Sequence, residues 1–354
     1  MPWNDSQDIF AYLIHRETLY FAKRPRSEDL HSPVSAVTSL IQGIYEHHPD
    51  QAHFIIRNRI YTNQTQATAL SYGMVKVAAK RIIYGTTLSH SLPSRVVDYS
   101  GWRNLSQLSH PIQSPRKPSF DDTPFRGHDL QTILQKPELN DALFFSSFKK
   151  EFMSQSTDQQ WMRLTHALLD SWSHKHTSSL QISSSQDSPP NLRSLDTSCT
   201  DLHTCDTHPH SDQSHSMTEA YAQDRSIAAL LVGPHPIDDR EIILGMSLNT
   251  QSVNRTLHAE VNLIQNYFQR TKTALPAHCK IFTTLKPCRM CAGMIWESAS
   301  SPGSLKVFYS KDDPGAHATQ TVLASHSEDR KRFLKNGVSA SSEILVFLNL
   351  FSHK

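Results

Sequence analysis

Two short stretches of this sequence could together hold a catalytic metal ion. The first is HAE at residues 258–260, and the second is PCRMC at residues 287–291. One imidazole and two thiolates supply three ligands, and a tetrahedral zinc site with three protein ligands keeps its fourth position for water. Glu260 is spaced for proton transfer rather than for a fourth ligand. We therefore predict one zinc ion with a bound water molecule, held by His258, Cys288 and Cys291, with Glu260 as the catalytic acid and base.

The elements around these stretches predict how the ligands meet. Thr256 is expected to cap a helix over 257–270, which places His258 and Glu260 in its first turn. Pro287 favours the start of a second helix over 288–298, after a strand over 280–284. The two cysteines, three residues apart, then share one helix face, and the helix N-terminus favours the thiolate form that binds metal.

Each motif is weak when taken alone. His-x-Glu also occurs at His15 and His326, in a predicted hairpin and a polar stretch. Cys-x-x-Cys could instead be a redox pair, or half of a structural zinc site with Cys279 as the fourth ligand. A polar stretch carries another group of potential ligands, for which a solvated segment is the favoured interpretation because nothing nearby would hold them rigid: Cys199, His203, Cys205, His208, His210 and His215.

The chain contains two blocks with the element order β-β-α-β-α-β, which favours a three-layer α/β/α fold. In the first, a hairpin is expected over 8–24, helices over 33–45 and 67–79, and strands over 53–62 and 81–84. In the second, a hairpin over 227–232 and 241–247 precedes the two site helices, and strands follow at 280–284 and 305–309. Residues 86–136 lack pattern, helices are expected over 139–153 and 158–174, and a last element over 344–351.

The two blocks look like tandem copies that form an intramolecular pseudo-dimer with one inactive half. No cysteine precedes Cys199, and Val34-Ser35-Ala36 stands where the second block has its HAE motif. An unrelated α/β domain is the alternative. We expect a degenerate domain over 1–110, a linker with a helix over 111–154, and a catalytic domain over 155–354 with a disordered polar insertion over 173–217.

The amino-acid composition indicates the cellular compartment of the protein. The 354 residues are 38% hydrophobic, carry a formal net charge of +2 and include five cysteines, an odd number that argues against a disulfide framework. Neither a secretory signal nor a membrane span is visible. A soluble, cytoplasmic protein is therefore expected, with no membrane partner.

The second block resembles the cytidine/deoxycytidylate deaminase superfamily, and within it the tRNA adenosine deaminases. The carrying residues are LKPCRMCAGMI at 285–295, supported by Trp161-Met162-Arg163. The resemblance implies that Asn249 contacts the base, and we expect Ala259 and Pro287 at the substrate as well. Lys286 departs from the family pattern, which usually has an acid there, as does the long connection at 300–303.

The sequence leaves three candidate functions to be tested. The resemblance implies hydrolytic deamination of adenosine to inosine in tRNA or another RNA, by a family whose RNA-acting members are dimers. The alternatives are a deaminase of free bases, nucleosides or nucleotides, such as guanine, cytidine or deoxycytidylate, and a non-enzymatic zinc-stabilised nucleic-acid-binding module. A further homodimer is open, and eight basic residues could contact phosphate: Lys23, Arg24, Arg26, Lys76, Lys80, Arg81, Lys331 and Arg332.

Overall fold

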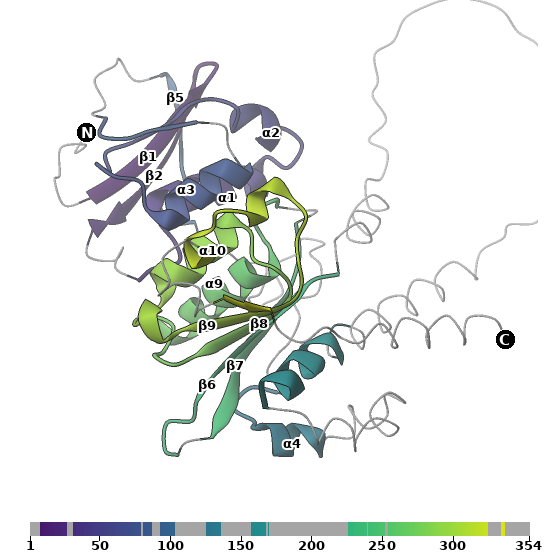
Figure 1. The fold of residues 1–354 in the computed structure, drawn as a ribbon. Coiled ribbons are helices and arrows are strands. Elements are labelled where there is room, and N and C mark those ends of the chain that lie inside the picture. The colour runs from purple at the N-terminus through teal and green to yellow at the C-terminus, as the bar shows by residue number, and fades with distance from the viewer. Residues whose placement is uncertain are drawn as a thin grey trace, which may run out of the picture.

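The computed structural model describes residues 8–26, 31–78, 81–86, 93–102, 125–135, 157–167, 169, 226–238, 240–251, 254–324 and 334–336. These residues form two five-stranded sheets with helices packed between them (Figure 1). The predictions for 139–153, 173–217 and 344–351 lie outside the described residues. So do Lys80, Lys331, Arg332 and the potential ligands from Cys199 to His215.

The first sheet is built on a hairpin. Strands β1 (Asp8–His15) and β2 (Thr18–Pro25) pair antiparallel, as predicted. Alternation along β1 sends Ile9, Ala11 and Leu13 into the main core, while Phe10 and Tyr12 join an aromatic cluster on the opposite face. The remaining strands are β3 (Ile60–Thr62), β4 (Ile82–Ile83) and β5 (Arg95–Asp98), in the order β4-β3-β1-β2-β5.

Helices α1 (Ala36–His47) and α3 (Ala69–Ala78) occupy the predicted positions in the first block. The expected strand over 53–62 is wrong in its first part, where α2 (Ala52–Ile55) forms instead. The Asn58 side chain closes that helix by donating to the carbonyl of Ile55 at 2.8 Å, and only the last three residues extend as β3. Strand β5 was also missed, because its four residues form a short and mostly exposed edge.

The second sheet follows the predicted element order. A hairpin of β6 (Ala228–Pro234) and β7 (Glu241–Leu248) is followed by α9 (Ala259–Thr271), β8 (Lys280–Leu285), α10 (Arg289–Ser298) and β9 (Lys306–Lys311). An unpredicted strand, β10 (Leu334–Asn336), pairs with β9. No helix in the described part of the chain is long and apolar enough to cross a membrane.

The second sheet is covered on both faces. Helices α9 and α10 pack on one face, and helix α4 (Leu130–Leu134) and a helix over 157–167 cover the other. Trp161 is fully buried there, and its indole Nε1 donates to Glu241 Oε2 at 3.0 Å. The second half therefore has the expected α/β/α layers, whereas the described residues of the first half supply helices to one sheet face.

The two sheets share one strand order over four strands. In both β2-β1-β3-β4 and β7-β6-β8-β9, a hairpin strand pairs antiparallel with the third strand, and the third pairs parallel with the fourth. The sheets differ at their fifth strands, because β5 adds beside β2 whereas β10 adds beside β9.

The helices of the two halves meet between the sheets, where α1 and α3 face α9 and α10 (Figure 1). A Cβ atom on Gly73 of α3 would lie 2.5 Å from the carbonyl oxygen of Arg289, and one on Gly293 of α10 would collide with the carbonyl oxygen of Ala69. Buried Gln265 of α9 donates to the Gln42 side chain of α1 at 2.9 Å. The two halves therefore pack closely against each other through these four helices.

This close approach predicts that Gly73→Ala and Gly293→Ala each destabilise the protein. Each added methyl group meets backbone, which cannot rotate aside, so the free energy of unfolding should fall by about 1–3 kcal/mol. The penalty should exceed the gain in helix propensity of about 1 kcal/mol. Denaturant unfolding measures the effect, and Gly303→Ala is the control because a Cβ there meets nothing within 4 Å. Equal stability of all three variants would contradict the observed packing.

Candidate active site

His258 is the N-cap of α9, with extended backbone angles of φ −68° and ψ 161°. Its carbonyl accepts the amide hydrogen of Asn262 at 2.9 Å, which begins the helix. The prediction that Thr256 caps this helix is therefore wrong. The Thr256 hydroxyl instead donates to Asn254 Oδ1 at 2.7 Å and stabilises the turn that leads into the helix.

Cys288 is the N-cap of α10, and Cys291 lies one turn along. Pro287 therefore precedes the helix rather than occupying its first turn. The Cys288 carbonyl accepts the amide hydrogen of Ala292 at 2.8 Å. Both predicted metal-binding stretches thus begin at helix N-termini, where amide groups favour negative charge.

The three predicted ligands converge on one point. His258 Nδ1 lies 3.6 Å from Cys288 Sγ and 3.5 Å from Cys291 Sγ, and the two sulfur atoms are 3.6 Å apart. A tetrahedral zinc ion with Zn–S of about 2.3 Å and Zn–N of about 2.0–2.1 Å separates its ligand atoms by about 3.6–3.8 Å. The donor types and spacings therefore fit zinc, and these residues form a group that could hold a metal ion.

The electrostatics of the two thiols favour metal binding. The hydrogen bond with Cys291 and the nearby imidazole of His258 lower the pKa of Cys288 well below its usual value, against the opposing effect of burial. Burial raises the pKa of Cys291. Cys288 therefore loses its proton readily, whereas deprotonation of Cys291 is unfavourable in this buried site. A bound metal dication would offset the cost of the second thiolate.

Glu260 is 3% exposed and lies in the first turn of α9. Its Oε1 atom lies 3.0 Å from the hydroxyl of Thr283 on β8, which donates to it. Burial raises the pKa of the Glu260 carboxyl, while the charge of His258 and the Thr283 hydrogen bond lower it. A buried carboxyl beside a metal site is suited to taking up and releasing a proton.

The three residues expected at the substrate have different surroundings. Asn249 directly follows β7, is 3% exposed, and donates its backbone amide to Ile227 O at 3.0 Å. Ala259 is fully buried in the main core, and Pro287 is also buried. Cys279, the alternative fourth ligand, lies in the core, and among the described residues it is not part of the metal group. Burial raises its pKa to about 12.

Sequence reasoning missed the side chains that position the site. Asn262 donates to the carbonyl of Leu248 at 2.9 Å and to the Thr250 hydroxyl at 3.0 Å, which ties α9 to the end of β7. Asn254 orders the turn before His258 and also donates to Gln42 O of the first half at 3.3 Å. Thr283 could have been found from its alternation with Ile281 along the strand, because side chains two residues apart lie on the same face of β8, here the face that packs against the helices.

Removing the Thr283 hydroxyl should impair Glu260. Thr283→Val keeps the shape of the side chain but removes a hydrogen bond worth about 1.5 kcal/mol or more to a charged group, so turnover should fall about 10-fold. That bond lowers the pKa of Glu260, so its loss raises the pKa. Because a base must be ionised, the acidic limb of the pH–rate profile should move to higher pH.

Thr284→Val provides the matched control. The Thr284 hydroxyl accepts from the backbone amide of Ala228 at 3.1 Å, and among the described residues no bond joins it to Glu260. This variant should lose stability and keep the pH profile. An unchanged acidic limb in Thr283→Val would show that the hydroxyl does not support Glu260.

Comparison with known proteins agrees with this geometry. Residues 218–334 match the family model of the Bd3614-like deaminases, a match that includes all three ligands and Glu260. Residues 218–334 of the second half are therefore similar to the Bd3614-like deaminases. No curated protein sequence matches the chain.

Solved structures of deaminases align with about a third of the chain. A structure from a study of A-to-I editing by tRNA:A34 deaminases is 23% identical, and the alignment covers 34% of this chain and 84% of that one with a TM-score of 0.25. Guanine deaminase from Nitrosomonas europaea is 17% identical, with 36% and 73% covered and a TM-score of 0.27. Guanine deaminase from Bacillus subtilis is 21% identical, with 36% and 81% covered and a TM-score of 0.20. At these TM-scores the alignments carry no argument about substrate.

Proposed function

We propose that this chain is a zinc-dependent hydrolytic deaminase that converts adenosine to inosine in tRNA or another RNA. The observation that carries the deaminase chemistry is the convergence of His258, Cys288 and Cys291 at zinc-ligand spacing, with buried Glu260 in the adjoining helix turn. The RNA substrate rests on the resemblance of residues 285–295 to the tRNA adenosine deaminases, and on the two-half architecture.

Glu260 performs the proton transfers in this proposal. His258, Cys288 and Cys291 would hold a zinc ion, which would lower the pKa of a bound water molecule. Glu260 accepts one proton from water and delivers it to the ring nitrogen, while the water oxygen bonds to the amino-bearing carbon. It then moves the second proton from that oxygen to the amino group, and the C–N bond breaks, so that the amino substrate and water yield the keto product and ammonia. Thr283 holds the carboxyl during both transfers.

Asn249 and the residues beside the ligands are proposed to position the base. Asn249 lies at the end of β7, next to the loop that leads to His258, which suits a contact with the substrate ring. Ala259 and Pro287 are buried, so their proposed contacts are through backbone or through the packed wall of the site.

The first half is proposed to be an inactive copy that pairs with the catalytic half as an internal pseudo-dimer. The shared strand order and the contacts of Gly73 with α10 and Gly293 with α3 support this. Ser35 caps α1 as His258 caps α9, and the side chains of Gln42 and Gln265, each seven residues further on, hydrogen-bond to each other. Corresponding residues in contact are the mark of a two-fold relation.

The positions that match the ligands carry hydroxyl groups in the first half. Ser35 matches His258, one residue later than the sequence alignment placed it, and Thr68 and Ser71 match the two cysteines. Each of these hydroxyls has a local partner: Thr68 Oγ1 donates to Ser71 Oγ at 3.0 Å, and Ser35 Oγ accepts from the amide of Thr38 at 3.2 Å. Val37 matches Glu260 and is fully buried, so this half is proposed to lack both metal and proton transfer.

The proposed domains are a degenerate unit over 1–110, a linker over 111–154 and a catalytic unit over 155–354. A reducing compartment such as the cytoplasm fits the free thiols of Cys279, Cys288 and Cys291.

A substrate panel tests the proposal. Purified zinc-loaded protein is incubated with tRNA, single-stranded RNA, single-stranded DNA, adenosine, cytidine, guanine and deoxycytidylate, and ammonia release is measured. Release from tRNA or RNA alone, with inosine formed, supports the proposal. Release from a free base, nucleoside or nucleotide alone would replace it with the small-molecule alternative. Zinc binding without release from any substrate would favour a binding module.

A further inference from the structure

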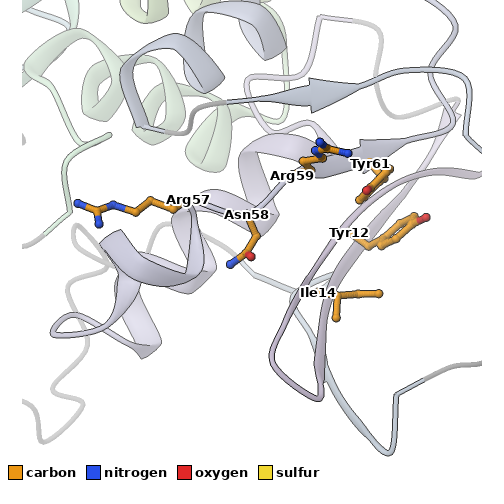
Figure 2. A pocket seen from close by; sticks show the side chains of 6 residues that line it. All are labelled: Tyr12, Ile14, Arg57, Asn58, Arg59 and Tyr61. Atoms are coloured by element: carbon orange, nitrogen blue, oxygen red, sulfur yellow. The ribbon is translucent and has the colours of Figure 1, made fainter.

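A cavity of about 370 Å³ lies in the first half, away from the metal group. It is lined by Tyr12 and Ile14 of β1, by Tyr61 of β3, and by the connection that carries Arg57, Asn58 and Arg59 (Figure 2). The Tyr12 and Tyr61 rings are stacked with their centroids 5.1 Å apart. The residues that line the cavity thus include a pair of aromatic rings and two arginines, and none of them is acidic.

The corresponding place in the second half is a closed core. Tyr61 stands between Ile60 and Thr62 on β3, as Phe282 stands between Ile281 and Thr283 on β8. Phe282 is fully buried and stacks on Phe308 with centroids 4.9 Å apart, in the cluster that contains Trp161. Tyr61 is partly exposed at the cavity. In the first half the aromatic partner lies on the other neighbouring strand, where Tyr61 stacks on Tyr12 of β1 and keeps an open side.

An aromatic–cation pair lies beside the cavity. Phe54 of α2 is 52% exposed, and the Arg57 guanidinium lies over its ring at 5.5 Å from the centroid. In Figure 2 the Arg57 side chain extends away from the tyrosines, whereas Arg59 lies near Tyr61. Both arginines are exposed, and neither forms an ion pair among the described residues. Phe54 with Arg57, and Tyr61 with Arg59, therefore bring rings and cations to adjoining parts of this surface.

We infer that this surface binds single-stranded RNA, with one base against Tyr61, and with Arg59 and Arg57 on successive phosphates. Stacking on aromatic side chains and contacts of basic groups with the backbone are the two elements by which proteins bind single strands. The choice of RNA over DNA rests on the proposed function, and the surface would hold the substrate strand outside the reaction centre.

Fluorescence anisotropy with a labelled single-stranded RNA, using full-length zinc-loaded protein, tests the inference. Arg57→Ala and Arg59→Ala should each reduce the slope of log affinity against log salt by about 0.7, the value for one phosphate contact on a single strand. Arg95→Ala is the matched control, because Arg95 is exposed on β5 at the opposite edge of the same sheet. It should leave the slope unchanged.

Tyr61→Leu separates stacking from charge. It should weaken RNA binding about 5- to 150-fold, the range for loss of one stacked base, without changing the salt slope. Retained zinc content and an unchanged melting temperature confirm that the variant is folded. Parallel titrations with single-stranded DNA, with adenosine monophosphate and with inorganic phosphate identify the ligand.

RNA binding that weakens in the three cavity variants and not in Arg95→Ala is the expected result. Equal RNA affinity and salt slope in all variants would overturn the inference, even if the protein deaminates RNA. Tight binding of adenosine monophosphate or phosphate with weak binding of the strand would also overturn it. RNA binding is measured without turnover, so the inference and the proposed function can fail separately. If the wild-type protein binds RNA but releases no ammonia, and the cavity variants weaken that binding, the proposed function is refuted and this inference is retained.

Discussion

Replacing Glu260 with glutamine is expected to abolish turnover while the protein keeps its metal. Glutamine preserves the size of the side chain and can still contact Thr283, but it cannot accept a proton from water. Loss of general acid–base catalysis typically costs about 10²- to 10⁴-fold, and one residue serves both transfers here, so the loss should lie at the upper end. Ammonia release measures the rate, and elemental analysis measures zinc.

The matched control is Glu17→Gln, because Glu17 is exposed in the turn of the β1–β2 hairpin. It should keep full activity and bind the same amount of zinc. If Glu260→Gln turned over substrate at the wild-type rate, Glu260 could not be the proton carrier. If it lost zinc as well as activity, the carboxyl would be a ligand, contrary to the spacing of the three ligand atoms.

Replacing Cys291 with serine is expected to remove the zinc ion and lower the stability of the catalytic half. A serine hydroxyl is a poor zinc ligand, and the remaining imidazole and single thiolate cannot complete the site. Zinc at 100 times its dissociation constant stabilises a protein by about 2.7 kcal/mol, and this contribution should vanish. The melting temperature should therefore fall and no longer respond to a zinc chelator, which does lower it in the wild type.

Cys279→Ala discriminates the proposed site from a structural one with four ligands. Cys279 is a buried thiol in the same half, and its pKa is raised by burial rather than lowered by a metal-binding neighbour. The variant should keep one zinc ion and its response to the chelator, with a modest loss of packing stability. Loss of zinc in Cys279→Ala would show that all four groups bind the metal and that no position is open for water.

The grouping of the candidate site residues was predictable in part because the signals within each pair are local. His258 and Glu260 lie two residues apart, Cys288 and Cys291 lie three apart, and each pair begins a helix, so sequence spacing alone fixes which side chains meet. The hairpins were predictable for a similar reason, since the β-rich runs before and after Arg16 and Glu17 pair with their immediate neighbours.

The errors arose where competing local interactions decided the outcome. Thr256 is a residue type that often caps helices, but its hydroxyl donates to Asn254 Oδ1 instead. The helix begins two residues later, with His258 as its N-cap. The run before Ile60 is rich in β-forming residues, yet Asn58 closes a helical turn there. In each case a single side-chain hydrogen bond outweighed a propensity that averages over several residues.

Features that depend on distant parts of the chain could not be predicted. The hydrogen bond between Gln42 and Gln265 and the contact of Gly73 with Arg289 join residues more than two hundred positions apart. Strand β10 pairs with β9, although the sequence around β10 shows no strand pattern. The cavity lined by Tyr12, Tyr61 and Arg59 also results from tertiary packing, since its residues come from two segments that are more than forty positions apart.

The most direct test of the account is deamination of RNA in heavy-oxygen water. Zinc-loaded protein and its Glu260→Gln variant are incubated with tRNA, the RNA is digested to nucleosides, and inosine is measured by mass spectrometry. The account predicts inosine that carries the heavy oxygen at the carbon that lost its amino group, formed by the wild type and not by the variant. Absence of inosine, inosine without the heavy oxygen, or equal amounts from both proteins would contradict it.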